Sequence, residues 1–89
     1  MIKKGLKIKN QMGLHARPAA MLAQTAGKFS SDIKIAKDGL EVDAKSIMGI
    51  MMLAAPQGAV LEFTFTGADE AAALKALEDL FNSGFSEAY

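Results

Sequence analysis

The chain has 89 residues, enough for one modest hydrophobic core and too few for two, so we expect a single domain over residues 1–89. Ten basic residues balance ten acidic ones, which leaves no net positive field for a phosphate backbone, and we expect no nucleic-acid partner. Cysteine is absent and histidine occurs once, so we expect neither disulfides nor a protein metal site.

The chain begins with a basic stretch, residues 1–7, that leads into alternating residues rather than an apolar run. No segment approaches the roughly 20 apolar residues that a membrane-spanning helix needs. We therefore expect no insertion into a membrane and a location in the cytoplasm.

The first predicted element is a strand, because Leu6 and Ile8 alternate with lysines. Residues 10–13 are typical of a loop. From Ala16 onward apolar residues recur at helical spacing, and Gly27 favours an end to this helix. The sequence therefore predicts a strand, a loop and a helix over the first third of the chain.

A β-hairpin follows the first helix. Ile33 and Ile35 alternate with polar residues in one short strand, and Leu40 and Val42 do so in the next. The sequence Lys-Asp-Gly at residues 37–39 separates them and is a strong signal for a tight turn.

A short helix is predicted over residues 47–54, with Ser46 as its N-cap. A helix this short and this apolar cannot bury every face. If Ile50 and Leu53 point inward, three side chains must lie largely exposed, namely Ile47, Met48 and Met51. We expect Met52 to fill a gap in the core, as methionine often does.

The last strand and the last helix follow a break at residues 56–58, Pro-Gln-Gly. The fourth strand alternates apolar with polar residues, its apolar positions being Leu61, Phe63 and Phe65. Asp69 can cap the last helix, and Gly84 is placed to end it. The buried face of this helix is expected at Leu74, Leu77 and Phe81, flanked by Ala73 and Leu80.

The predicted order is βαββαβα, and each strand has only one apolar face. Helices should therefore cover a single side of an antiparallel sheet and leave the other side in water. The predicted fold class is a two-layer α+β open-faced sandwich.

The only histidine of the chain, His15, directly precedes the first predicted helix. Pro18 suits the first turn of that helix, whose unpaired amides and partial positive charge favour a phosphate. A neutral imidazole is a nucleophile near neutral pH, while the amides of Ala16 and Arg17 and the Arg17 guanidinium could hold oxyanions. Gly13 would let the backbone turn sharply before the ring. These residues suit a phosphohistidine, but by themselves they also fit a His15 that merely caps a helix.

The motif GLHARPA at residues 13–19 and the run KSIMGIM at residues 45–51 resemble the HPr family, the phosphocarriers of the bacterial sugar phosphotransferase system. The likeness spans nearly the whole chain. It implies the sheet order 1-4-2-3, with three helices on one face. It also implies a carrier rather than an enzyme, without a cofactor, and we expect a monomer.

By this resemblance, His15 accepts a phosphoryl group from the phosphohistidine of enzyme I, which phosphoenolpyruvate has charged. His15 then passes the group to a sugar-specific IIA domain, and Arg17 steadies the phosphate. The family uses the Nδ1 nitrogen. Its members dock on partners through the first two helices, which implies an interface that includes the apolar residues Ile47, Met48 and Met51.

The serine that matches Ser46 is phosphorylated in many relatives by an ATP-dependent HPr kinase, which also implies contacts with this kinase/phosphorylase and with transcriptional regulators. A phosphate there would suit the helix N-terminus and would repel an approaching enzyme I. Met12 stands where relatives often carry a small polar residue, so a hydrogen bond from that side chain to the site is not expected.

Several alternatives remain open at this point. The runs at residues 50–53 and 80–85 resemble NPr, the carrier of the nitrogen-related branch. A purely regulatory module without chemistry at His15 is a further alternative, although the intact histidine argues against it. A ferredoxin-like RNA-binding or small-molecule-binding domain would not explain GLHARPA. A serine hydrolase lacks support because no G-x-S-x-G motif is present.

Overall fold

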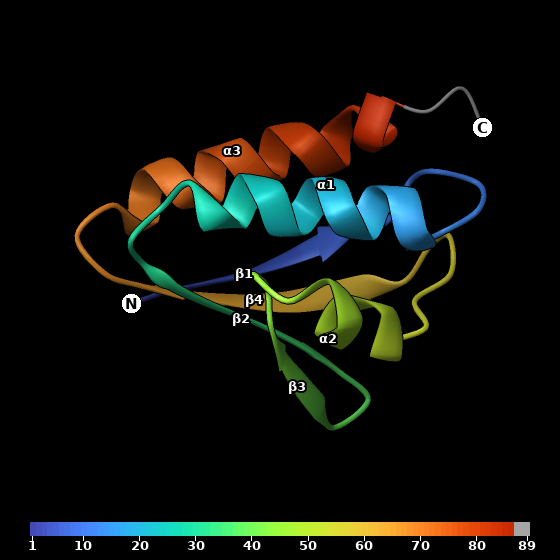
Figure 1. Ribbon diagram of the computed structural model, residues 1–89, viewed down its shortest axis with the longest axis horizontal. Helices are drawn as coiled ribbons and strands as arrows, with labels where there is room; N and C mark the ends of the chain where they lie inside the picture. Colours follow the sequence, from blue (N-terminus) through green and yellow to red (C-terminus); the bar gives the residue numbers. More distant parts are fainter. Residues whose placement is uncertain (87–89) are drawn as a thin grey trace.

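The computed structural model describes residues 1–86, which form four strands and three α-helices in the order βαββαβα (Figure 1). The elements are β1 (Ile2–Lys7), α1 (Ala16–Gly27), β2 (Asp32–Lys37), β3 (Leu40–Asp43), α2 (Ile47–Met52), β4 (Val60–Thr66) and α3 (Glu70–Asn82), followed by a 3₁₀ turn (Gly84–Ser86). The sheet is antiparallel and its order is β1-β4-β2-β3. The predicted fold class and strand order are therefore confirmed. The expected end of the domain at residue 89 lies outside the described residues.

The register of the sheet brings the apolar residues of neighbouring strands to one face. Leu6 pairs with Leu61, and Ile33 pairs with Phe65, and all four side chains are buried. Helices α1 and α3 lie side by side over this face (Figure 1), while α2 packs against α1 and β3. The opposite face of the sheet is polar: Thr64 of β4, for example, pairs with Lys3 of β1 on one side and with Lys34 of β2 on the other.

Aromatic side chains form the centre of the core. The Phe63 ring stacks on Phe65 at 5.8 Å and meets Phe81 edge to face at 5.4 Å between centroids. The ring centroid of Phe85 lies 4.9 Å from that of Phe81. Phe85 is fully buried, although it follows Gly84, the glycine just after the last helix. Burial of one such ring stabilises the fold by about 1.5–3 kcal/mol.

The first half of the chain departs from the predictions only at element ends. β1 begins at Ile2, earlier than predicted, and Ile8 lies just beyond it yet is fully buried. α1 has the predicted bounds. Leu40 is more exposed than a core residue because β3 is an edge strand with a neighbour on one side only.

The expectation for Met52 is wrong, because its side chain is 66% exposed. α2 ends at this residue instead of reaching position 54, and only Ile50 and Leu53 of this region turn into the core. Ile50 is the buried residue of this six-residue helix and Leu53 directly follows it, whereas Met52 is exposed together with Met48 and Met51.

Two details of α3 also differ from the predictions. Asp69 stands at the N-cap position, but its side chain makes no capping hydrogen bond and instead binds the segment before β2. Leu74 is only partly buried, whereas Ala73 is fully buried together with Leu77.

Within residues 1–86, no helix has both the length and the apolar character that a membrane crossing requires.

Candidate functional site

His15 is half-buried and stands at the N-cap of α1, with an extended backbone at φ −77° and ψ −174°. Its carbonyl oxygen accepts the first helical hydrogen bond, from the amide of Ala19 at 3.0 Å. The N–H groups of Ala16 and Arg17 therefore make no hydrogen bond within the helix, and Pro18 has no N–H group. The His15 side chain makes no capping bond to the first turn, so the cap role alone does not account for it.

Gly13 makes the sharp turn that the sequence predicts two residues before the histidine. Its φ is +68°, and a Cβ at this position would lie 2.5 Å from the carbonyl oxygen of Ala55 and 2.9 Å from Cα of Pro56. The next amide, that of Leu14, donates to the same Ala55 oxygen at 3.0 Å. Only a glycine fits here, because the two backbones touch.

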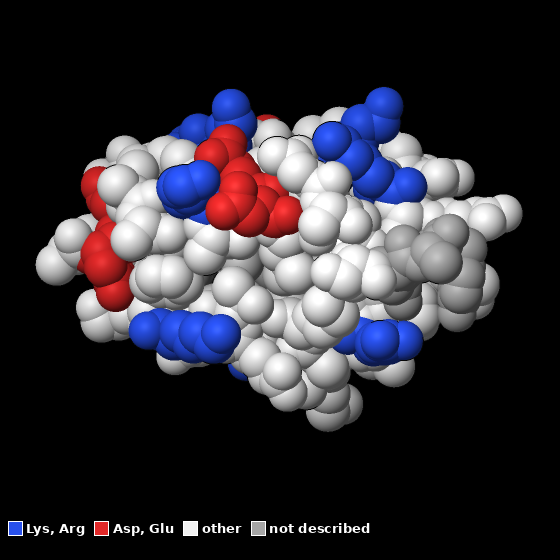
Figure 2. Space-filling model, turned by 90° about the horizontal axis from the view of Figure 1, so that it is seen from above, with Lys and Arg blue, Asp and Glu red and all other residues white. Residues whose placement is uncertain are grey.

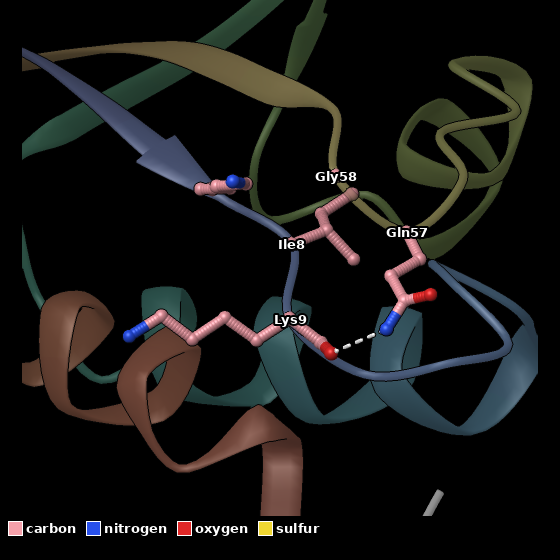
Figure 3. A pocket seen from close by; sticks show the side chains of 5 residues that line it. Ile8, Lys9, Gln57 and Gly58 are labelled. Carbon is pink, nitrogen blue, oxygen red and sulfur yellow. Dashed lines mark hydrogen bonds between the residues drawn. The ribbon is translucent and has the colours of Figure 1, made fainter.

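The residues before the turn are also held by the loop after α2. The amide of Gly58 donates to the carbonyl of Ile8 at 2.8 Å, and the Ile8 amide donates to Ala59 at 2.9 Å. The Gln57 side chain donates to the carbonyl of Lys9 at 3.1 Å (Figure 3). The loop that leads to His15 therefore rests on a second loop more than 40 residues away in sequence.

A surface pocket of about 440 Å³ lies between these two loops and is lined by Lys7, Ile8, Lys9, Gln57 and Gly58 (Figure 3). The pocket is open, and two of its polar side chains have partners, since Gln57 binds Lys9 and the Lys9 ammonium binds Asn82 at 3.1 Å. The pocket thus lies at the junction between the two loops.

Asn10 is a site residue that sequence reasoning missed. It is buried, and its Nδ2 donates to the carbonyl of Gly13 at 2.7 Å, while the Gly13 amide donates back to the Asn10 carbonyl at 3.2 Å. An asparagine in a loop is typical of turns generally, so its type alone gave no sign of burial.

Ser46 is the N-cap of α2, as predicted, because its Oγ accepts a hydrogen bond from the amide of Gly49 at 3.1 Å. Its neighbour Lys45 donates to the carbonyl of Phe29 at 2.8 Å and so ties the start of α2 to the segment that follows α1. Ser46 itself is exposed.

The outer side of α2 is apolar and exposed, as predicted for Ile47, Met48 and Met51. Met48 is 78% exposed, whereas Ile50 on the inner side is fully buried. α2 packs on α1, so this apolar patch and the histidine belong to adjacent helices.

Charge is distributed unevenly around these elements. Residues 1–31 and 44–61, which supply α1, α2 and the loops before α1 and after α2, contain no Asp or Glu. Figure 2 looks down on α1 and α3, and the acidic side chains that this face shows lie in its left half, away from the end where α1 begins. Arg17 is exposed at that beginning. An anion that approaches the start of α1 thus meets no carboxylate from these segments.

Among residues 1–86, no three His, Cys, Asp or Glu side chains are grouped so that they could hold a metal ion.

A family model described as "PTS HPr component phosphorylation site" matches residues 2–83. The phosphocarrier protein HPr of Neisseria meningitidis serogroup A is 48% identical over 87 residues, 98% of each chain. The crystal structure of HPr from Thermoanaerobacter tengcongensis is 53% identical, covers 100% of both chains and superposes with a TM-score of 0.95. A crystal structure described as an HPr dimer from the same organism is 54% identical, covers 98% of this chain and 100% of its own, and has a TM-score of 0.79.

Proposed function

The chain belongs to the HPr family of phosphocarrier proteins of the phosphotransferase system, and on that premise we propose that His15 carries the phosphoryl group. The observation that carries this proposal is the place of His15 at the N-cap of α1, beside two amides that the helix does not use. Such a helix start offers oriented N–H groups and about half a positive charge to the oxygens of a phosphoryl group.

The proposed reaction is a direct transfer between two imidazoles. A ring nitrogen of His15, Nδ1 by the family's pattern, attacks phosphorus as the P–N bond to the phosphohistidine of enzyme I breaks, and the donor ring leaves with that electron pair. The amides of Ala16 and Arg17 and the Arg17 guanidinium hold the three phosphoryl oxygens. The second transfer, to a IIA domain, breaks the new bond in the same way. His15 is regenerated, so the protein acts as a carrier and not as an enzyme.

The proposed docking surface is the exposed patch of α2, formed by Ile47, Met48 and Met51, together with the start of α1. Methionine side chains are flexible and polarisable, which suits a surface that must fit enzyme I and a IIA domain in turn. The absence of carboxylates from these segments favours partners with acidic surfaces.

Ser46 is the proposed site of regulatory phosphorylation by an HPr kinase/phosphorylase, with transcriptional regulators as readers of the modified form. The serine is exposed, as a kinase substrate must be, and a phosphate would lie at the start of α2 beside the docking patch. We place this carrier in the cytoplasm with its phosphoryl donor, and we propose a monomer as the acting form, since each chain carries its own histidine and patch.

The closest alternative is a carrier of the nitrogen-related branch, which uses the same chemistry with different partners. The intact His15 and its helix start favour either carrier over a purely regulatory module. The alternative is therefore settled by which IIA domain accepts the phosphoryl group.

The direct experiment is to incubate the protein with purified enzyme I and phosphoenolpyruvate and to measure its mass. We expect the addition of one acid-labile phosphoryl group, absent from His15→Ala and retained by the control Ser46→Ala. An unchanged mass of the wild type, beside an enzyme I that phosphorylates a known HPr, would contradict the proposal.

A further inference from the structure

We propose that Asn10 is a positioning residue for phosphoryl transfer, because it holds the turn that presents the imidazole of His15. This inference rests on the proposed function of His15. It assigns a role to a buried side chain five residues before His15.

The evidence begins with the burial of a polar side chain. Asn10 is 4% exposed, and a buried amide is costly unless it is hydrogen-bonded. Its Nδ2 lies 2.7 Å from the carbonyl oxygen of Gly13, and the amide of Gly13 returns a bond to the Asn10 carbonyl at 3.2 Å. The two bonds close residues 10–13 into one rigid turn.

The other side of this turn rests on a fixed surface. Gly13 touches the backbone of Ala55 and Pro56, and the amide of Leu14 is bonded to the Ala55 carbonyl. Ahead of the turn, the Gln57 side chain holds the carbonyl of Lys9 (Figure 3). The hydrogen bond from Asn10 thus holds Gly13 in its place beside Ala55 and Pro56. His15 follows Gly13 by two residues.

Position 12 cannot provide this bond. Met12 has a thioether side chain, which donates no hydrogen bond, and it is 59% exposed. The polar support of the turn therefore comes from position 10.

The consequence for transfer follows from geometry. In-line displacement at phosphorus requires the attacking nitrogen to be held within a fraction of an ångström, and a misplacement of about 1 Å can cost about a hundredfold in rate. Loss of the Asn10 amide would leave the Gly13 carbonyl buried without this donor and would loosen the turn. The docking patch on α2 would be untouched, so the bound complex would form normally and react slowly.

The test compares Asn10→Ala and the similarly shaped Asn10→Leu with Ser31→Ala as a matched control. Ser31 is also a buried polar residue, but it lies beyond the opposite end of α1, where its hydroxyl binds Asp69. All variants are assayed with enzyme I and phosphoenolpyruvate well below their unfolding temperatures, and the His15 ring signals are recorded by NMR. Should Asn10→Ala fail to fold, Asn10→Leu carries the comparison, because it keeps the approximate shape of the side chain, lacks the donor and adds no charge.

With the Asn10 variants as substrates, we expect the kcat of enzyme I to fall about tenfold or more below its value with the wild-type carrier, while the KM for the carrier stays within about twofold. The His15 ring signals should shift. Ser31→Ala should lose stability and keep its kcat. Three results would overturn the inference: an unchanged kcat in both Asn10 variants, an effect confined to KM, or an equal loss of kcat in Ser31→Ala. A wild type that accepts no phosphoryl group contradicts the proposed function itself, whereas an active wild type with unaffected Asn10 variants contradicts only the role of Asn10.

Discussion

One carboxylate oxygen of Asp69 accepts hydrogen bonds from both the hydroxyl and the backbone N–H of Ser31, the latter at 2.9 Å. Its second oxygen accepts a hydrogen bond from the backbone N–H of Ser30, also at 2.9 Å. These bonds join the start of α3 to the segment between α1 and β2. They replace the capping role that the sequence suggested for Asp69.

We predict that this contact makes stability depend on pH in a narrow acidic range. The hydroxyl of Ser31 first, and then the amide of Ser30, lower the pKa of Asp69 from 3.8 to about 2. Because the folded pKa is the lower one, the stabilisation is complete above pH 3.8 and is lost as pH falls toward 2. In urea unfolding, the wild type should exceed Asp69→Asn in stability at neutral pH, and the gap should shrink toward pH 2. A gap that is independent of pH would contradict this assignment.

Gly13→Ala should destabilise the fold by about 3 kcal/mol and also slow phosphoryl transfer. A left-handed backbone costs a non-glycine residue about 1–2 kcal/mol, and the new Cβ would collide with Ala55 as well. Gly39→Ala is the matched control, since its φ is +84° and no atom lies within 4 Å of the added Cβ. The difference between the two variants in chemical unfolding isolates the collision, and equal losses would mean that no collision occurs.

Arg17→Ala should slow phosphoryl transfer by about tenfold or more and change the free energy of unfolding by less than about 0.5 kcal/mol. The side chain is exposed on the first turn of α1, so its loss removes a charge near the phosphoryl group and little packing. Lys28→Ala, at the other end of the same helix, removes an equal charge and should transfer normally. A marked fall in melting temperature for Arg17→Ala would instead indicate a structural residue.

Ser46→Ala and Ser46→Asp should separate the cap of α2 from the effect of charge. Alanine removes the acceptor for the Gly49 amide and should cost about 1 kcal/mol of stability, with docking to enzyme I preserved. Aspartate keeps a capping oxygen, so stability should remain, while its negative charge weakens docking. Titration calorimetry with enzyme I measures both affinities, and an unaltered affinity for Ser46→Asp would remove the regulatory proposal.

Met48→Gln should weaken binding to enzyme I and leave the unfolding transition unchanged. The Met48 side chain is 78% exposed and makes the outer surface of α2, so its apolar area contributes to a complex and not to the core. Val60→Thr, an exposed apolar position on β4, serves as the control and should bind normally. Equal affinities for the two variants would place the docking surface elsewhere.

Much of the site could be predicted because its signals are local. A proline in the first turn identifies the start of α1 and thereby places His15, and Ser46 is a preferred N-cap residue beside an apolar run. The exposure of Met48 follows from the length of α2 alone. The error at Met52 falls where burial depends on neighbours, and the burial of Phe85, which follows a helix stop and still enters the core, had no sequence signal.

The sequence by itself determined the order of the elements, the single apolar face of each strand and the position of the only histidine at a helix start, because these depend on spacing and on backbone preferences within a few residues. The tertiary structure alone decided that Asn10 is buried, that Gly13 lies against Ala55 and that Asp69 binds Ser31. The last two relationships join residues about 40 positions apart, and all three depend on how helices and loops pack over the sheet. Such packing is set by the whole chain at once, which no short pattern encodes.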